Sequence, residues 1–183
     1  SIDKIATSFP ARFYKVEAKS YFTKTPAVET AYKLGIDQAG LEKNLFFTGE
    51  MNGYYGATVE EHTGGVDMFL EATEGGYNLY FMAGEAKKYI TIVISGKYKN
   101  FTIADAPANV WTFDATNNTL VSELEGTTYY LGTYGTYNTV SVSSIDKIET
   151  SYPARLYVAD PATSGSGSAA GTIAGILEEA ADL

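Results

Sequence analysis

The feature that most constrains the fold is a series of short runs rich in Tyr, Phe, Val, Ile and Thr, separated by Gly, Asn and Asp. β-Branched and aromatic residues favour extended strands, and turn-forming residues between them set the strand ends. The runs predicted as strands are 31–36, 44–48, 54–59, 66–71, 77–82, 88–94, 101–104, 110–113, 119–124, 128–132, 139–143 and 154–158. So many strands in one domain imply an all-β fold with a single closed or two-layer antiparallel sheet.

Three of the separators are typical of tight hairpin turns. They are Glu74-Gly75-Gly76, Asn117-Asn118 and Glu125-Gly126. Gly and Asn adopt the positive φ angles that tight hairpins need, so consecutive strands are expected to pair with each other. The sequence therefore predicts an antiparallel meander.

A weaker pattern divides the chain into three units of four strands, which start at Tyr32, Met68 and Trp111. Four strands in about forty residues, repeated three times, is typical of a β-trefoil, a closed fold with three-fold symmetry. The unit starts are spaced unevenly, by 36 and then 43 residues. The β-trefoil is the favoured prediction, and an OB-like barrel or a β-sandwich stays open as an alternative. Trp111 lies inside an apolar run and is expected in the core.

The segment 1–14 is repeated as 144–157, with eleven of fourteen residues identical. Such a repeat is typical of tandem modules. We therefore interpret residues 1–25 as the closing strand of a preceding repeat plus a linker, and 26–160 as a complete β module. Residues 161–183 are expected to form a Gly/Ser linker and a short helical tail.

The two copies of this segment also lead to a hypothesis about assembly. Pro10, Arg12 and Tyr14 in the first copy correspond to Pro153, Arg155 and Tyr157 in the second. The motif is typical of an edge strand that begins with proline and has an arginine available for a carboxylate. Because there are two copies of the strand for one sheet position, a stalk or fibre repeat that exchanges strands head-to-tail between identical modules is the alternative to a ligand-binding module. Otherwise the first copy is expected to be partly unfolded or to pack loosely alongside.

The charge and the residue types exclude several classes of function. A net charge of -9 opposes binding to nucleic acid, because phosphates would be repelled. The chain has no cysteine and no apolar run long enough to insert into a membrane, so thiolate metal sites and membrane insertion are not expected.

Catalytic chemistry has little support in the sequence. The single histidine, His62, follows Glu60-Glu61 in a polar stretch that we interpret as a solvated loop. No Gly-x-Ser-x-Gly elbow and no cofactor motif is present. The sequence predicts a protein that is not an enzyme and that has neither a cofactor nor a metal.

Ligand binding through aromatic side chains is the more favoured class. Tyr54 and Tyr55, and Tyr134 and Tyr137, lie in turn-like sequence where side chains tend to be exposed. A tyrosine ring can stack on the apolar face of a sugar while its hydroxyl forms a hydrogen bond. The alternative is that these tyrosines pack across strands, as is common in β proteins.

Four sequence segments resemble a known group of modules. They are 31–36 (AYKLGI), 47–58 (FTGEMNGYYGAT), 74–81 (EGGYNLYF) and 129–139 (YYLGTYGTYNT). Together they resemble uncharacterised β modules of large secreted or surface-anchored proteins from gut-type Gram-positive bacteria, over about residues 26–158. The resemblance implies an extracellular or cell-surface accessory module for adhesion or carbohydrate binding, with a glycan or host-surface ligand as partner.

Overall fold

The computed structural model describes residues 22–37, 44–133, 139–143 and 152–159, which all belong to one compact unit, Ser20–Asp160. These residues are almost entirely strand, and the one helical element among them is the short 3₁₀ turn His62–Gly64. The all-β prediction is confirmed. The first copy of the repeated segment and the helical tail expected near the C-terminus lie outside the described residues.

Each predicted run coincides with an observed strand, although the bounds differ by up to four residues. The strands of the described part are β1 Tyr32–Asp37, β2 Asn44–Asn52, β3 Tyr55–Val59, β4 Asp67–Thr73, β5 Gly76–Ala83, β6 Ala86–Ser95, β7 Tyr98–Ala104, β8 Thr112–Asp114, β9 Thr119–Leu124, β10 Thr127–Thr133, β11 Ser141–Ser143 and β12 Tyr152–Val158.

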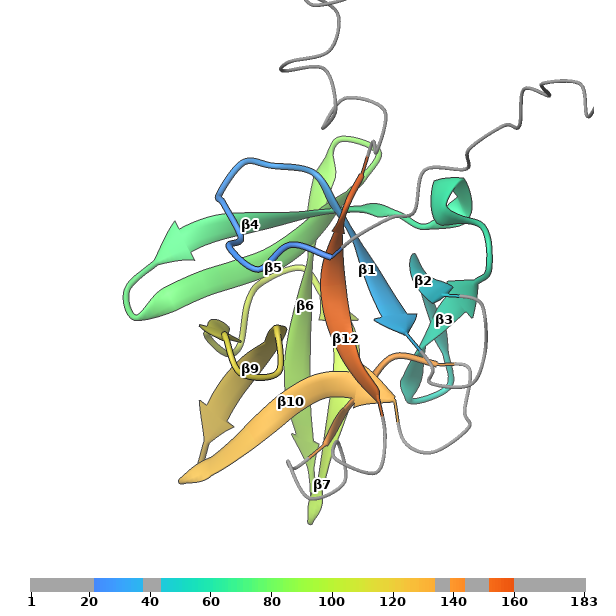
Figure 1. Cartoon of the computed structure of the whole chain (residues 1–183). Helices are drawn as coiled ribbons and strands as arrows, with labels where there is room; N and C mark the ends of the chain where they lie inside the picture. The colour runs from blue at the N-terminus through green and yellow to red at the C-terminus, as the bar shows by residue number, and fades with distance from the viewer. Residues whose placement is uncertain (1–21, 38–43, 134–138, 144–151, 160–183) are drawn as a thin grey trace, which may run out of the picture. The chain divides into compact units, whose positions relative to one another are not determined.

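The strands form one antiparallel sheet with the order β7-β6-β5-β4-β1-β12-β10-β9-β8, and β2, β3 and β11 branch from this path. Most neighbours follow each other in the chain, as expected for hairpins. The exceptions are β1, which pairs with β4 and with β12, and β12, which also pairs with β10. Figure 1 shows β12 alongside β1 in the middle of the molecule.

The prediction that the repeated motif forms an edge strand is wrong for the second copy. β12 pairs with β1 from Ile36↔Ala154 to Tyr32↔Val158. Its other side pairs with the end of β10 at Pro153 and bridges to Phe22 at Tyr157. Proline is tolerated here because Pro153 is near the start of the strand, where the ladder to β10 ends after two residue pairs.

The predicted turns adopt the expected backbone conformations. Gly75 has φ 85°, Asn118 has φ 53°, and Glu125 and Gly126 have φ 51° and 74°. A two-residue turn joins Leu124 to Thr127, which are direct partners in the ladder, and the positive φ angles of both central residues, Glu125 and Gly126, make it a type I′ turn. Glu125 therefore accepts a conformation that is unfavourable for a residue with a Cβ atom.

The division into three units starts at the wrong residue. Tyr32 and Met68 are direct partners in the ladder between β1 and β4, and Trp111 forms a bridge with Tyr77. Tyr32 is thus the ladder partner of Met68 and not its equivalent in an earlier unit, so the first predicted start is misplaced.

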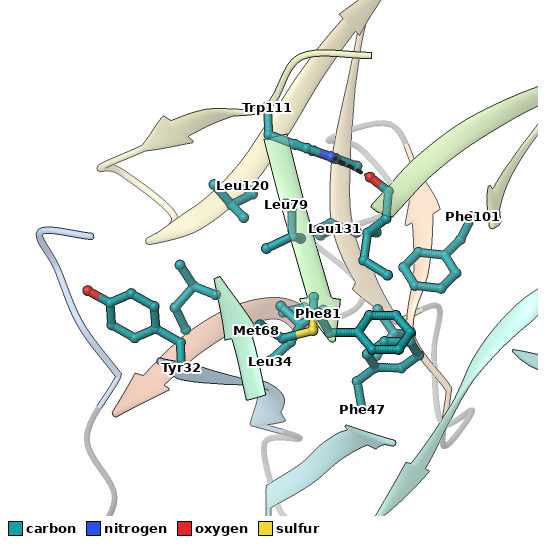
Figure 2. Close-up of a cluster of buried hydrophobic side chains, with 14 of the residues drawn as sticks. Tyr32, Leu34, Phe47, Met68, Leu79, Phe81, Phe101, Trp111, Leu120 and Leu131 are labelled. Atoms are coloured by element: carbon teal, nitrogen blue, oxygen red, sulfur yellow. Dashed lines mark hydrogen bonds between the residues drawn. The ribbon is translucent and has the colours of Figure 1, made fainter. Parts of the chain in front are cut away.

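The core contains large apolar side chains contributed by nearly every strand, several of which Figure 2 shows in contact. Trp111 is fully buried, as predicted, and its indole Nε1 donates a hydrogen bond to the carbonyl of Ile90 at 2.9 Å. Buried indoles need such an acceptor. This bond, drawn as a dashed line in Figure 2, ties the residue before β8 to β6.

Candidate functional site

The β2–β3 hairpin presents the two tyrosines that the sequence singled out. Asn52 and Tyr55 are direct partners, so Gly53 and Tyr54 form a two-residue turn, in which Gly53 has φ 64°. Tyr54 is 70% exposed and Tyr55 is 48% exposed. Two consecutive tyrosines at the tip of this hairpin are therefore exposed to solvent.

The base of this hairpin is fixed by contacts to distant segments. The Gly56 amide donates to the Val140 carbonyl at 2.8 Å, and the Val140 amide donates to the Gly56 carbonyl at 3.0 Å. A Cβ atom at Gly56 would lie 2.8 Å from the Phe47 ring and 3.0 Å from the Phe101 ring. Close packing here requires glycine, and it holds the backbone directly below Tyr54 and Tyr55.

Tyr134 and Tyr137, the other two tyrosines predicted to contact ligand, lie outside the described residues. The structure therefore does not place them near Tyr54 and Tyr55 or away from them.

A third exposed tyrosine was missed by the sequence analysis. Tyr98, at the tip of the β6–β7 hairpin, is 62% exposed, and Val93 and Ile94 on the same hairpin are also exposed. The predicted strand began only at residue 101, so Tyr98 was not considered. The glycine at Gly96, with φ 59°, was the local signal for a hairpin turn that could have located it.

A row of aromatic side chains crosses the outward side of β4, β5 and β6. Phe69, Tyr80 and Tyr89 are successive cross-strand partners, with ring centroids 5.5 Å and 6.0 Å apart. The Lys87 ammonium lies 4.4 Å from the Tyr80 ring centroid and 2.6 Å from a Glu71 oxygen. The lysine thus already occupies a face of the central ring, and this row is a weaker candidate for stacking on a ligand.

The charges around this row shift each other's titration. The hydrogen bond from Lys87, followed by that from Asn78, lowers the pKa of Glu71, and the same bond to Glu71 raises the pKa of Lys87. Both groups are at the surface, so the pair contributes little to stability.

The second copy of the repeated segment is placed by β12. Tyr157 is 2% exposed, and its ring packs edge-on against Phe46 and Phe22 at centroid distances of 5.5 Å and 6.1 Å. Arg155 holds its guanidinium carbon 4.6 Å from the Phe22 ring centroid. Pro153 lies opposite Gly132. The matching residues of the first copy, Pro10, Arg12 and Tyr14, lie outside the described residues.

His62 is not the solvated loop residue that the sequence predicted. Its Nε2 lies 2.9 Å from the Val158 carbonyl, and its ring packs edge-on against Phe46 at 5.0 Å. Because a carbonyl only accepts, Nε2 carries the proton in this contact. His62 therefore holds the end of β12 in place.

Within the described ranges, no three or more His, Cys, Asp or Glu side chains form a group that could hold a metal ion. The same part of the chain contains no helix that is long and apolar enough to cross a membrane.

Comparison with known proteins does not identify a relative. No family model matches the chain, and neither the curated proteins nor the solved structures contain a significant match. The geometry of the site and the sequence therefore carry the functional argument.

Proposed function

We propose that this chain is a non-catalytic binding module that recognises carbohydrate through the tip of its β2–β3 hairpin. The observation that carries this proposal is the exposure of the consecutive residues Tyr54 and Tyr55 at the hairpin tip, on a backbone that the hydrogen bonds of Gly56 hold. Tyrosine loses little conformational entropy on binding, and its ring and hydroxyl suit the apolar and polar parts of a sugar. Location on the surface of a bacterium, within a multi-domain protein, is part of the proposal and rests on the resemblance noted above.

We also propose that the sheet has the three-fold plan of a β-trefoil. Met68, Trp111 and Ala154 recur at intervals of 43 residues and are all buried. Each of these three residues lies in or next to a strand that is paired with, or hydrogen-bonded to, a strand earlier in the chain. The three contacts are Tyr32↔Met68, Tyr77↔Trp111, and the hydrogen bond from the Thr119 hydroxyl to the Ala154 carbonyl.

The strand neighbours support the same plan. Following contacts from β1 to β4, β5, β8, β9 and β12 leads back to β1. The remaining strands form the hairpins β2–β3, β6–β7 and β10–β11. Six strands in a ring and three hairpins are the parts that a β-trefoil requires. In this plan the Tyr54–Tyr55 tip belongs to the first of three related hairpins.

Binding to an array of glycans, followed by titration of the best hit, tests the carbohydrate proposal. Each stacked ring contributes about 1 kcal/mol, so replacing both Tyr54 and Tyr55 by alanine is expected to weaken binding by tenfold or more. Tyr98→Ala is the matched control, because Tyr98 is similarly exposed on a different hairpin tip. Its binding is expected to equal that of the unaltered protein.

Two results would contradict the proposal. One is that the unaltered protein binds no glycan on the array. The other is that Tyr98→Ala weakens binding as much as the double replacement, which would move the ligand site to the β6–β7 hairpin.

A further inference from the structure

β12 lies between β1 on one side and β10 with Phe22 on the other. A strand in this place must carry side chains that fit the surrounding core. Ala154, Leu156 and Tyr157 are 1%, 2% and 2% exposed. The Tyr157 ring lies 2.9 Å from where a Cβ atom of Gly35 would be, so the glycine and the tyrosine fit each other. We refer to this place as the β12 position.

Many of the hydrogen bonds that hold a strand in the β12 position are made by that strand's backbone, so they do not depend on its side chains. The ladder to β1 spans five residue pairs. The Thr23 amide donates to the Leu156 carbonyl at 2.7 Å, and the Thr119 hydroxyl lies 2.5 Å from the Ala154 carbonyl. Any segment with a compatible set of side chains could accept the same hydrogen bonds.

The segment 9–15 carries such a set. Aligned on the repeat, Pro10, Ala11, Arg12 and Tyr14 are identical to the residues in the same places of β12. The small buried residue, the ring that fits Gly35 and the guanidinium that lies over Phe22 are therefore all retained. Among the positions 153–157, only Leu156 changes, and its counterpart Phe13 is still apolar.

The chain connection allows this segment to reach the β12 position of its own molecule. Phe22 lies directly opposite Tyr157 in an antiparallel bridge. With Tyr14 in the place of Tyr157, the seven residues 15–21 would join Tyr14 to its antiparallel partner Phe22, as in a hairpin. A connection this short gives a high effective concentration, which favours the same molecule over a second one.

Two differences between the copies would favour β12 in this position. Phe13 is larger than Leu156, and enlarging a residue in a packed core is unfavourable. Lys15 would replace Val158 at the half-buried end of the strand. The first copy would thus be a compatible but weaker occupant of this position.

We propose that residues 9–15 can replace β12 and close the module within the same chain, so that the module has two alternative closing strands. In a tandem array, the strand that ends one module would then be able to close the next one. This inference is independent of glycan binding.

Substitutions in the full-length chain test the proposal. Ala154→Asp places a carboxylate where the structure has a buried methyl group, and so excludes β12. The variant is expected to keep a cooperative thermal transition, with the midpoint lowered by on the order of 10 °C. Ala11→Asp alone is the matched control and should leave the midpoint unchanged. The double variant should lose the transition, and adding Phe13→Leu to Ala154→Asp should raise the midpoint.

Trypsin cleavage identifies the strand in the β12 position, because each copy carries one arginine, Arg12 or Arg155. In the unaltered protein Arg155 should be protected. In Ala154→Asp, mass spectrometry should show cleavage after Arg155 and new protection of Arg12, and light scattering should show a monomer.

Three outcomes would overturn the proposal. In the first, Ala154→Asp is as unfolded as the double variant. In the second, Ala154→Asp folds only as dimers or polymers, which would indicate exchange between molecules. In the third, Arg155 stays protected and Ala11→Asp adds nothing to Ala154→Asp, which would mean that β12 tolerates the aspartate.

Discussion

Replacing Thr119 by valine measures how much one buried hydroxyl contributes to joining three strands. Thr119 is 1% exposed and lies in β9, and its Oγ1 is 3.1 Å from the Leu131 carbonyl of β10 and 2.5 Å from the Ala154 carbonyl of β12. The hydroxyl has one proton, which either carbonyl can accept. Valine has nearly the same shape, so the substitution removes the hydrogen bond without opening a cavity.

The size of the effect follows from the burial of these groups. Leaving a buried carbonyl without its hydrogen bond costs about 1–3 kcal/mol, so we expect Thr119→Val to lower the free energy of unfolding by about 2 kcal/mol. With a urea m-value of about 2 kcal/mol/M, the unfolding midpoint should fall by about 1 M. Trp111 is the single tryptophan and is fully buried, so its fluorescence reports the transition.

Thr128→Val is the matched control, since Thr128 is an exposed threonine in the neighbouring strand β10. Exposed substitutions of this kind change stability by about 0.5 kcal/mol or less. If both variants shift the midpoint equally, the Thr119 hydroxyl does not join the three strands as argued.

Two other residues give predictions of stability. Gly56→Ala should lower the free energy of unfolding by about 2–3 kcal/mol, because its Cβ would overlap the Phe47 and Phe101 rings. Gly53→Ala should lower the free energy of unfolding by about 1 kcal/mol through its positive φ alone, because nothing lies within 4 Å of the added Cβ. Urea unfolding compares the two variants, and equal losses of stability would contradict the packing argument for Gly56. For Asp114, burial raises the pKa, but hydrogen bonds from Asn117 and from the backbone of Thr116 and Asn117 outweigh it and lower the pKa overall. The folded pKa is thus below the unfolded one, so the contribution of Asp114 is present above about pH 4 and lost as the pH falls through the folded pKa. The stability difference between the unaltered protein and Asp114→Ala should be about 1 kcal/mol at pH 7 and should shrink in urea titrations near pH 3; a difference independent of pH would contradict this.

The local parts of the fold could be predicted from the sequence because their causes are local. Runs of β-branched and aromatic residues gave the strands, and Gly75, Asn118 and Gly126 have the positive φ angles that mark the turns. Trp111 was assigned to the core from its apolar neighbours. These properties depend on residues a few positions apart.

The pairing of distant strands could not be predicted in the same way. Pro153 made β12 look like an edge strand, because proline cannot donate to a ladder, yet both sides of β12 are paired. Tyr98 was missed because the lysines around it obscured the start of β7. The partners of His62 come from β2 and the end of β12, so the local sequence could not indicate that it is held by them.

The place of β12 in the sheet has a consequence for synthesis on the ribosome. β1 is translated before the other described strands, whereas β12, which lies between β1 and β10, is translated after them. Until residue 158 has left the exit tunnel, the edges of β1 and β10 that face the β12 position can pair only with another segment, such as residues 9–15 of the same chain as proposed above. Where that segment does not fill the position, these edges are open to pairing with other chains, so this interval favours aggregation.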